Sequence, residues 1–121
     1  MNEGEVIKDL KNNFYLRIDK NDEVRFLDSS TLNHAICLEV ADATYNLYSI
    51  SYEDLCHKIP RKIGARSTIL NSLNFAVSKG FFIKKSSEHD KRIKTYTLSE
   101  NFRETILQWI KELQSVTSNI K

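Results

Sequence analysis

The sequence has few of the residues that mark catalytic, phosphate-binding or disulfide-rich proteins. Its 121 residues include three glycines, one proline and two cysteines. Three glycines are too few for a loop that cradles phosphate, and no paired carboxylates, nucleophile–base set or cluster of metal ligands stands out. The sequence therefore predicts neither an enzyme nor a bound cofactor.

The two cysteines indicate neither a metal site nor a disulfide framework. Cys37 and Cys56 lack the C-x-x-C spacing and have no neighbouring cluster of His and Asp. His57 adjoins Cys56, but adjacent residues on a helix point in different directions, which argues against a nucleophile–base pair. We interpret both as structural thiols in a reducing compartment.

Long apolar runs are also missing. The first residues, MNEGEVIKDL, contain no apolar run of signal-peptide length, and no stretch reaches the roughly eighteen apolar residues of a membrane span. We therefore expect a cytoplasmic protein without a membrane anchor. Its length predicts a single domain over residues 1–121, near the size at which helical proteins often gain stability by dimerising.

The basic residues are concentrated in the middle of the chain. Between Lys58 and Lys94 there are ten basic and two acidic residues, whereas the remainder has eight basic and fourteen acidic ones. This distribution is typical of a phosphate-binding surface on an otherwise acidic protein, although a solvated charged face would give the same count. The basic segment coincides with a predicted helix and hairpin, which favours nucleic-acid binding.

That segment centres on residues 65–98. Ile69, Leu73, Ala76 and Val77 have the spacing of an amphipathic helix, which Gly80 then ends. Residues 81–85 and 93–98 alternate as two strands of a hairpin with a polar tip between them.

These residues resemble the winged helix-turn-helix of the MarR family of bacterial transcriptional regulators. The resemblance rests on Arg66-Ser67-Thr68-Ile69 opening the helix, Lys79-Gly80-Phe81 closing it, and Asp90-Lys91-Arg92 with Leu98-Ser99-Glu100 in the wing. The family pattern is D-x-R followed by a strand ending in L-T-E, so a serine replaces the usual threonine. The chain departs from the family at residues 60–64, where the turn is about three residues longer, and at Ala65, where a capping serine is common.

The flanking segments predict further helices. Residues 5–20 have an amphipathic spacing, although residues 14–27 could instead form a small hairpin. A core helix is expected over residues 32–44, followed by a short strand over residues 45–50 beside the hairpin. Ser51 and Asp54 form a capping box for a helix over 52–59, and Ser99 caps a last helix to about residue 118.

The fold class is therefore mainly α with a small β-hairpin wing, in a winged helix-turn-helix. We expect its core over residues 29–99 and terminal helices, 5–20 and 99–118, that form a dimer interface, as the resemblance implies. The apolar side chains expected at this interface are Ile7, Leu10, Phe14, Phe102, Ile106, Trp109, Ile110, Leu113 and Val116.

The resemblance also implies a homodimer that binds a pseudo-palindromic site in double-stranded DNA. The residues expected to contact DNA are Arg61, Lys62, Arg66, Ser67, Thr68, Asn71, Lys91, Arg92 and Lys94. Arg66 would read guanine or hold a phosphate, Arg92 would enter the minor groove, and Asp90 would orient the wing.

Two alternatives remain at this point. A winged helix can serve as a protein–protein module without binding DNA, because fold alone does not fix function. Many MarR-like proteins also respond to a phenolic ligand near the dimer interface. Here Tyr45, Tyr48, Tyr52 and Trp109 would either line such a pocket for an unknown effector or belong to the core.

Overall fold

The computed structural model describes residues 2–18 and 22–117, and it confirms the predicted fold class. Within these residues the chain forms helices followed by a two-stranded hairpin and a last helix. The elements are α1 (Glu3–Ile18), α2 (Asp22–Asp28), α3 (Thr31–Tyr45), α4 (Tyr52–Lys58), α5 (Arg66–Ser78), β1 (Phe82–Ser86), β2 (Lys94–Leu98) and α6 (Glu100–Thr117).

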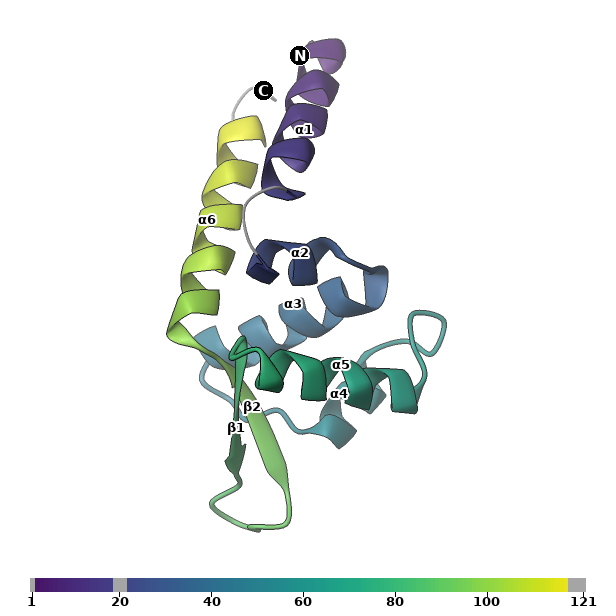
Figure 1. Cartoon of the computed structure of the whole chain (residues 1–121), viewed down its shortest axis with the longest axis vertical. Coiled ribbons are helices and arrows are strands. Elements are labelled where there is room, and N and C mark those ends of the chain that lie inside the picture. Colours follow the sequence, from purple (N-terminus) through teal and green to yellow (C-terminus); the bar gives the residue numbers. More distant parts are fainter. Residues whose placement is uncertain (1, 19–21, 118–121) are drawn as a thin grey trace.

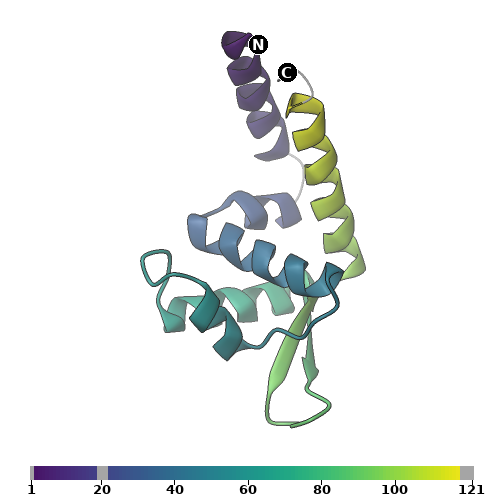
Figure 2. The same cartoon turned by 180° about the vertical axis from the view of Figure 1, so that it is seen from behind.

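The molecule is elongated, with helices at one end and the hairpin at the other. Helices α1 and α6 lie side by side, and the hairpin extends from the opposite end of the helical body (Figure 1). The view from behind shows α3, α4 and α5 grouped between these two ends (Figure 2). This group brings the helix-turn-helix next to the root of the hairpin.

An aromatic cluster holds α2 in the core. The ring of Phe26 lies 5.4 Å from that of Phe81 and between 5.8 and 6.4 Å from those of Phe75, Phe82 and Phe102, centroid to centroid. Burying a phenylalanine side chain contributes about 1.5–3 kcal/mol. An isolated helix of seven residues is unstable in water, so this packing is what maintains α2.

The helical prediction for the first segment is confirmed, and the hairpin alternative for residues 14–27 is wrong. Helix α1 covers residues 3–18 and α2 covers most of the second half of that alternative. Positions 19 and 20, at the expected end of the first helix, lie outside the described residues. Contacts with α2 and α6 hold α1 against the rest of the chain.

The strand predicted over residues 45–50 is wrong. Helix α3 continues to Tyr45, and Leu47 then adopts a left-handed φ of 59°, which turns the chain instead of extending it. The segment still meets the hairpin through the bond from the Tyr96 N–H to the Ile50 carbonyl, 3.0 Å, and a bridge between Ser51 and Thr95.

Local capping chemistry sets the ends of α4, α5 and α6 as predicted. Ser51 and Asp54 form the capping box of α4, and Gly80 ends α5 with a φ of 77°. The Phe102 N–H donates to Ser99 Oγ at 3.2 Å, so Ser99 caps the first turn of α6. The expected end of this helix, residue 118, lies outside the described residues.

The hairpin is antiparallel, and its strands pair from Phe82 with Leu98 to Ser86 with Lys94. This places the first strand one residue later than the predicted range of 81–85. Phe81 remains buried under the sheet, and its carbonyl accepts a bond from the Ser99 N–H at 2.9 Å. The tip therefore includes residues 87–93.

Candidate nucleic-acid interface

The turn before α5 is packed closely against α3. A Cβ atom at Gly64 would lie 2.6 Å from Leu32 Cδ1, so a side chain at this position would collide with the core helix. The turn then ends at Ala65, the N-cap of α5, which makes no side-chain capping bond. Because alanine stands where a capping serine is common, no N-cap side chain accepts a hydrogen bond from the backbone N–H groups in the first turn of α5.

Helix α5 buries one face and exposes a polar one. Ile69, Leu73 and Ala76 are buried, whereas Ser67, Thr68 and Asn71 are exposed. Arg61 and Lys62 in the preceding turn are exposed as well. The short hydrogen-bonding side chains therefore lie on a surface that no described part of the chain covers.

Arg66 does not extend freely into solvent. Its Nη2 forms an ion pair with Glu53 of α4, and its guanidinium lies 5.4 Å from the centre of the Tyr52 ring. The Tyr52 hydroxyl donates to the Arg66 carbonyl at 3.0 Å. The hydrogen bond to Glu53 raises the pKa of Arg66 above its ordinary value. Arg66 is thus held in place by two residues of α4.

Asp90 orients Arg92 at the tip of the hairpin. The Arg92 N–H donates to Asp90 Oδ1 at 2.9 Å, and the guanidinium donates to both carboxylate oxygens, at 3.1 Å from Nε and 3.0 Å from Nη2. The guanidinium lowers the pKa of the Asp90 carboxyl. The Arg92 side chain is nevertheless 90% exposed, so it is oriented without being covered.

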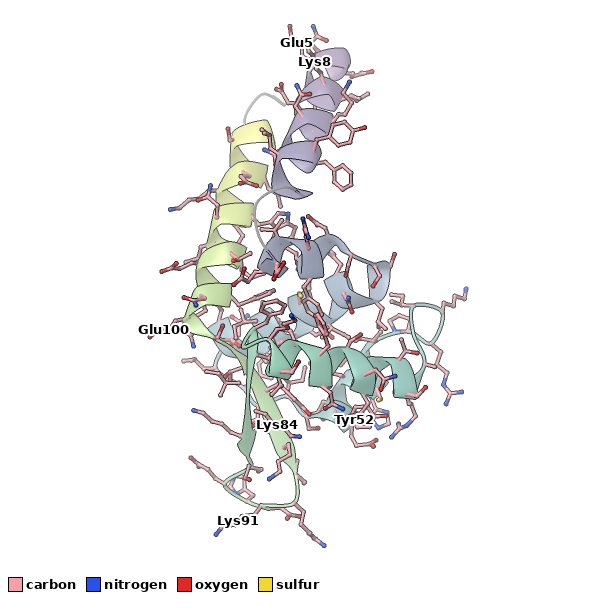
Figure 3. The ribbon with its side chains drawn as sticks, viewed as in Figure 1. Glu5, Lys8, Tyr52, Lys84, Lys91 and Glu100 are labelled. Atoms are coloured by element: carbon pink, nitrogen blue, oxygen red, sulfur yellow. The ribbon has the colours of Figure 1, made fainter. Side chains whose placement is uncertain are left out.

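The lysines of the hairpin differ in their hydrogen bonding. Lys94 Nζ donates to Ser86 Oγ at 2.7 Å and to the Lys91 carbonyl at 3.3 Å, which binds it across the hairpin. Lys84, Lys85 and Lys91 are exposed along the hairpin and at its tip. Figure 3 shows Lys84 on the hairpin beside the helical body and Lys91 at the far tip.

Comparison with known proteins identifies the fold. No protein-family model matches the sequence, and no curated protein matches it either. Several solved structures match over nearly the whole chain. FabT from Streptococcus pneumoniae, solved in complex with DNA, has a TM-score of 0.64 and 16% identity, and the match covers 97% of this chain and 78% of that one.

Two further solved structures match the chain with similar scores. The heme sensor protein PefR from Streptococcus agalactiae, in complex with heme, has a TM-score of 0.61 and 18% identity, with 98% of this chain and 78% of that one covered. A MarR-like transcriptional regulator from Thermotoga maritima has a TM-score of 0.60 and 16% identity, with 99% and 81% covered. The chain has the MarR-type winged-helix fold.

In MarR-type terms, α4 and α5 are the helix-turn-helix pair and the hairpin is the wing. The predicted contact residues come from three parts of this unit. Arg61 and Lys62 lie in the turn, Arg66, Ser67, Thr68 and Asn71 lie on α5, and Lys91, Arg92 and Lys94 lie on the wing. All are exposed. Among them, Lys94 donates a hydrogen bond to Ser86 of its own hairpin.

The apolar side chains of the terminal helices divide into two groups. Ile7, Leu10 and Phe14 of α1 and Ile110 and Leu113 of α6 are each more than one-third exposed. Trp109 is half-buried against the core, and its ring meets that of His34 at 5.4 Å. The side chain of Val116 lies outside what the structure describes.

The expectation for Phe102 and Ile106 is corrected. Both are buried within the single chain, at 0% and 3% exposure. They are in the first two turns of α6, where the helix packs on the aromatic cluster of the core rather than on α1. Neither side chain has surface left for a second copy.

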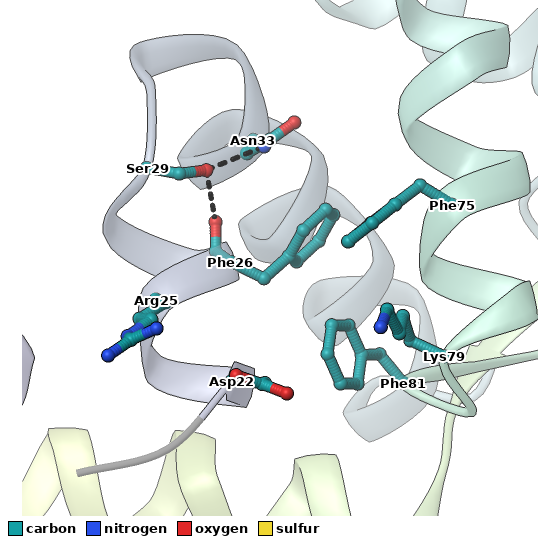
Figure 4. A pocket seen from close by; sticks show the side chains of 8 residues that line it. All are labelled: Asp22, Arg25, Phe26, Ser29, Asn33, Phe75, Lys79 and Phe81. Atoms are coloured by element: carbon teal, nitrogen blue, oxygen red, sulfur yellow. Dashed lines mark hydrogen bonds between the residues drawn. The ribbon is translucent and has the colours of Figure 1, made fainter.

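The four aromatic residues considered for an effector pocket lie in different surroundings. The centre of the Tyr52 ring lies 5.4 Å from Arg66 Cζ, and that of the Tyr45 ring lies 5.9 Å from Arg103 Cζ. The Tyr48 hydroxyl donates to Asp42 at 2.7 Å. An open hollow of about 440 Å³ lies elsewhere, between α2, α3 and α5, with Phe26, Phe75 and Phe81 on its apolar side (Figure 4). Its polar lining is Asp22, Arg25, Ser29, Asn33 and Lys79.

Sequence reasoning missed Glu53 and Tyr52 as partners of Arg66. They lie one helix and one turn before it in the sequence. Whether such positions meet depends on the crossing angle of the two helices, which the sequence does not give. Lys84 and Lys85 were also left out of the predicted contacts, although their place on an exposed strand of a basic hairpin was visible in the sequence.

The described residues contain no group of three or more His, Cys, Asp or Glu side chains arranged to hold a metal ion. None of the helices within the described ranges has both the length and the hydrophobicity needed to cross a membrane.

Proposed function

We propose that the chain is a sequence-specific double-stranded DNA-binding transcriptional regulator that acts as a homodimer. The observation behind this proposal is that the uncovered polar face of α5 and the oriented arginine of the wing belong to one winged-helix unit with a strongly basic segment. FabT, which shares this fold, was solved in complex with DNA, and this supports the same use of the fold here.

In this proposal α5 enters the major groove. Residues near the start of a recognition helix contact base edges, so Ser67, Thr68 and Asn71 are the side chains that read sequence. Asn pairs with adenine through two hydrogen bonds, whereas Ser and Thr accept several bases, so a half-site containing A and T is expected.

The wing and the turn before α5 supply the other contacts. Arg92 enters the minor groove, where a narrow A/T-rich segment concentrates negative potential and attracts a guanidinium. Lys91 and Lys94 neutralise phosphates without reading sequence. An open depression lined by Arg61, Ala65, Arg66 and Ser67 lies beside the uncapped start of α5, a suitable position for a phosphate of the DNA backbone.

The exposed apolar side chains of α1 and α6 support self-association. These helices lie side by side, and Ile7, Leu10, Phe14, Ile110 and Leu113 are left partly exposed on them. Contact between two copies through this region would remove these side chains from water. A symmetric dimer would then place two copies of α5 in successive major grooves, on half-sites about one helical turn apart.

The test is a titration of a fluorescently labelled mixed-sequence duplex with the protein, followed by anisotropy at several salt concentrations. Binding to phosphates releases counterions, so log affinity should fall steeply with log salt, by about 0.9 per phosphate neutralised. Saturable, salt-sensitive binding would justify selecting the specific site from random DNA. If no duplex binds even at low salt, the proposal fails and the protein–protein module becomes the better explanation.

A further inference from the structure

An acidic residue lies within the proposed DNA-binding face and is paired with one of its arginines. Glu53 is in the first turn of α4, Arg66 is the first residue of α5, and the ion pair joins the two helices of the helix-turn-helix. In Figure 3, Tyr52 lies on the lower side of the helical body, the side from which the hairpin extends. The pair is therefore on the same side of the molecule as the wing.

Two contacts of different kinds restrain the guanidinium. Glu53 accepts a hydrogen bond from Nη2, and the central carbon of the guanidinium, Cζ, lies over the Tyr52 ring, 5.4 Å from its centre. Tyr52 also fixes the backbone at this point, because its hydroxyl donates to the Arg66 carbonyl at 3.0 Å. A hydrogen bond at one nitrogen and an aromatic ring beside the central carbon together restrict where a guanidinium can lie, while its other N–H groups remain available.

A phosphate contact does not need this arrangement. The phosphate backbone attracts any cation, and a carboxylate beside the cation weakens that attraction and repels phosphates nearby. A base contact does need a fixed plane, since two N–H groups must meet O6 and N7 of guanine together. An acidic partner that restricts the guanidinium therefore suits a base contact by Arg66 better than a phosphate contact.

We propose that Glu53 is a specificity-determining residue that acts by positioning Arg66 to read a guanine in the major groove. This inference rests on the proposed function, because it requires α5 to bind DNA. It also assigns Glu53 a second effect, which is to oppose binding to DNA of unrelated sequence through repulsion of phosphates.

The experiment starts with a site selected from random DNA by the unaltered protein. Affinities are then measured for that site and for versions with each base pair replaced in turn, using the unaltered protein, Glu53→Gln, Arg66→Ala and the double variant. Glu88→Gln is the matched control, because it removes the same charge from an exposed position at the tip of the wing. Thermal unfolding monitored by circular dichroism checks that each variant is folded.

We expect Arg66→Ala to lose a preference of about tenfold for guanine at one position of each half-site. Glu53→Gln should lose most of the preference at the same position and bind unrelated DNA more tightly, whereas Glu88→Gln should keep the preference. In the Arg66→Ala background, the Glu53 substitution should cause no further loss of preference at that position.

Several results would overturn the inference. An equal change in the affinity of Glu53→Gln for every sequence, as expected for Glu88→Gln, would make Glu53 a simple source of charge. A stronger guanine preference in Glu53→Gln would mean that Glu53 holds Arg66 away from DNA. Failure of the unaltered protein to bind any duplex is a separate result, because it refutes the proposed function before the variants are compared.

Discussion

Three hydrogen bonds to Asp90 define the orientation of Arg92 in the wing. Asp90 accepts hydrogen bonds from its backbone N–H and from Nε and Nη2 of its guanidinium, while the side chain stays 90% exposed. A side chain that is already held in one orientation loses less conformational entropy when it binds a partner. In the proposed complex, this pair would lower the entropic cost of a contact between the wing and DNA.

We expect Arg92→Ala to weaken DNA binding severalfold or more without unfolding the protein, because the side chain contributes charge and little buried surface. Anisotropy titrations measure the affinity, and circular dichroism measures the thermal midpoint. Arg103→Ala in α6 removes a similar charge away from the wing and should have little effect. Unchanged affinity in Arg92→Ala would argue against a wing that contacts DNA.

Thr44 links the core helix to the wing through a single buried hydroxyl. Its Oγ1 donates to the Val40 carbonyl at 2.8 Å and accepts from the Leu98 N–H at 3.2 Å. Thr44 is 8% exposed, so water cannot readily replace it as the acceptor for Leu98.

Thr44→Val should therefore lower the free energy of unfolding by about 1–3 kcal/mol, because it leaves a buried N–H without its acceptor. Urea unfolding followed by circular dichroism measures this change. Thr44→Ser keeps the hydroxyl and should lose less. Equal stability of the valine variant and the unaltered protein would mean that the bond to Leu98 contributes nothing.

At the scale of elements, local signals predicted the long helices, the caps and the hairpin. The capping box at Ser51 and the stop at Gly80 were readable because each depends on residues within one turn. Local signals did not decide the structure of α2. Its residues fitted a strand of the alternative hairpin, and the packing of Phe26 against the phenylalanines of α5, β1 and α6 accompanies the helix that forms.

Contacts between elements were the part that the sequence could not predict. An apolar stripe on the last helix predicts burial, but its spacing does not say whether the chain's own core or a second copy covers it. Phe102 and Ile106 were assigned to the interface for this reason, and they belong to the core. The pairing of Glu53 with Arg66 was missed because a thirteen-residue separation has no periodic signal.

Gly80 gives a test of the junction between α5 and β1. An added Cβ would find no atom within 4 Å, so the expected effect comes from the backbone φ of 77° alone. Gly80→Ala should destabilise the protein by about 1–2 kcal/mol, the cost of a left-handed conformation for a residue with a Cβ. Gly80→Asn should cost less, since asparagine tolerates this region. Urea unfolding of both variants provides the comparison, and an alanine variant as stable as the glycine form would contradict it.

At the scale of the whole molecule, the fold leaves two faces open at opposite ends. The hairpin and the polar face of α5 form the basic one, and the exposed side chains of α1 and α6 form the apolar one. A regulator that binds two half-sites requires both, since affinity for the full site depends on linking two DNA-binding units.

We expect Leu10→Glu and Ile110→Glu to reduce self-association, because each places a charge among the apolar side chains of the two terminal helices. Sedimentation velocity over a range of concentrations measures the change in mass. Leu47→Glu is the control, since Leu47 is 92% exposed in the loop after α3. An unaltered protein that stays monomeric at all accessible concentrations would refute the dimer.

The side-by-side arrangement of α1 and α6 also governs where a label can be attached. The start of α1 and the end of α6 both lie at the end of the molecule opposite the hairpin tip (Figures 1 and 2). A dye or an immobilising tag placed before α1 or after α6 would leave the basic face open to DNA. A bulky fusion partner at the same places would crowd the apolar face, so small tags suit measurements of stoichiometry better than large ones.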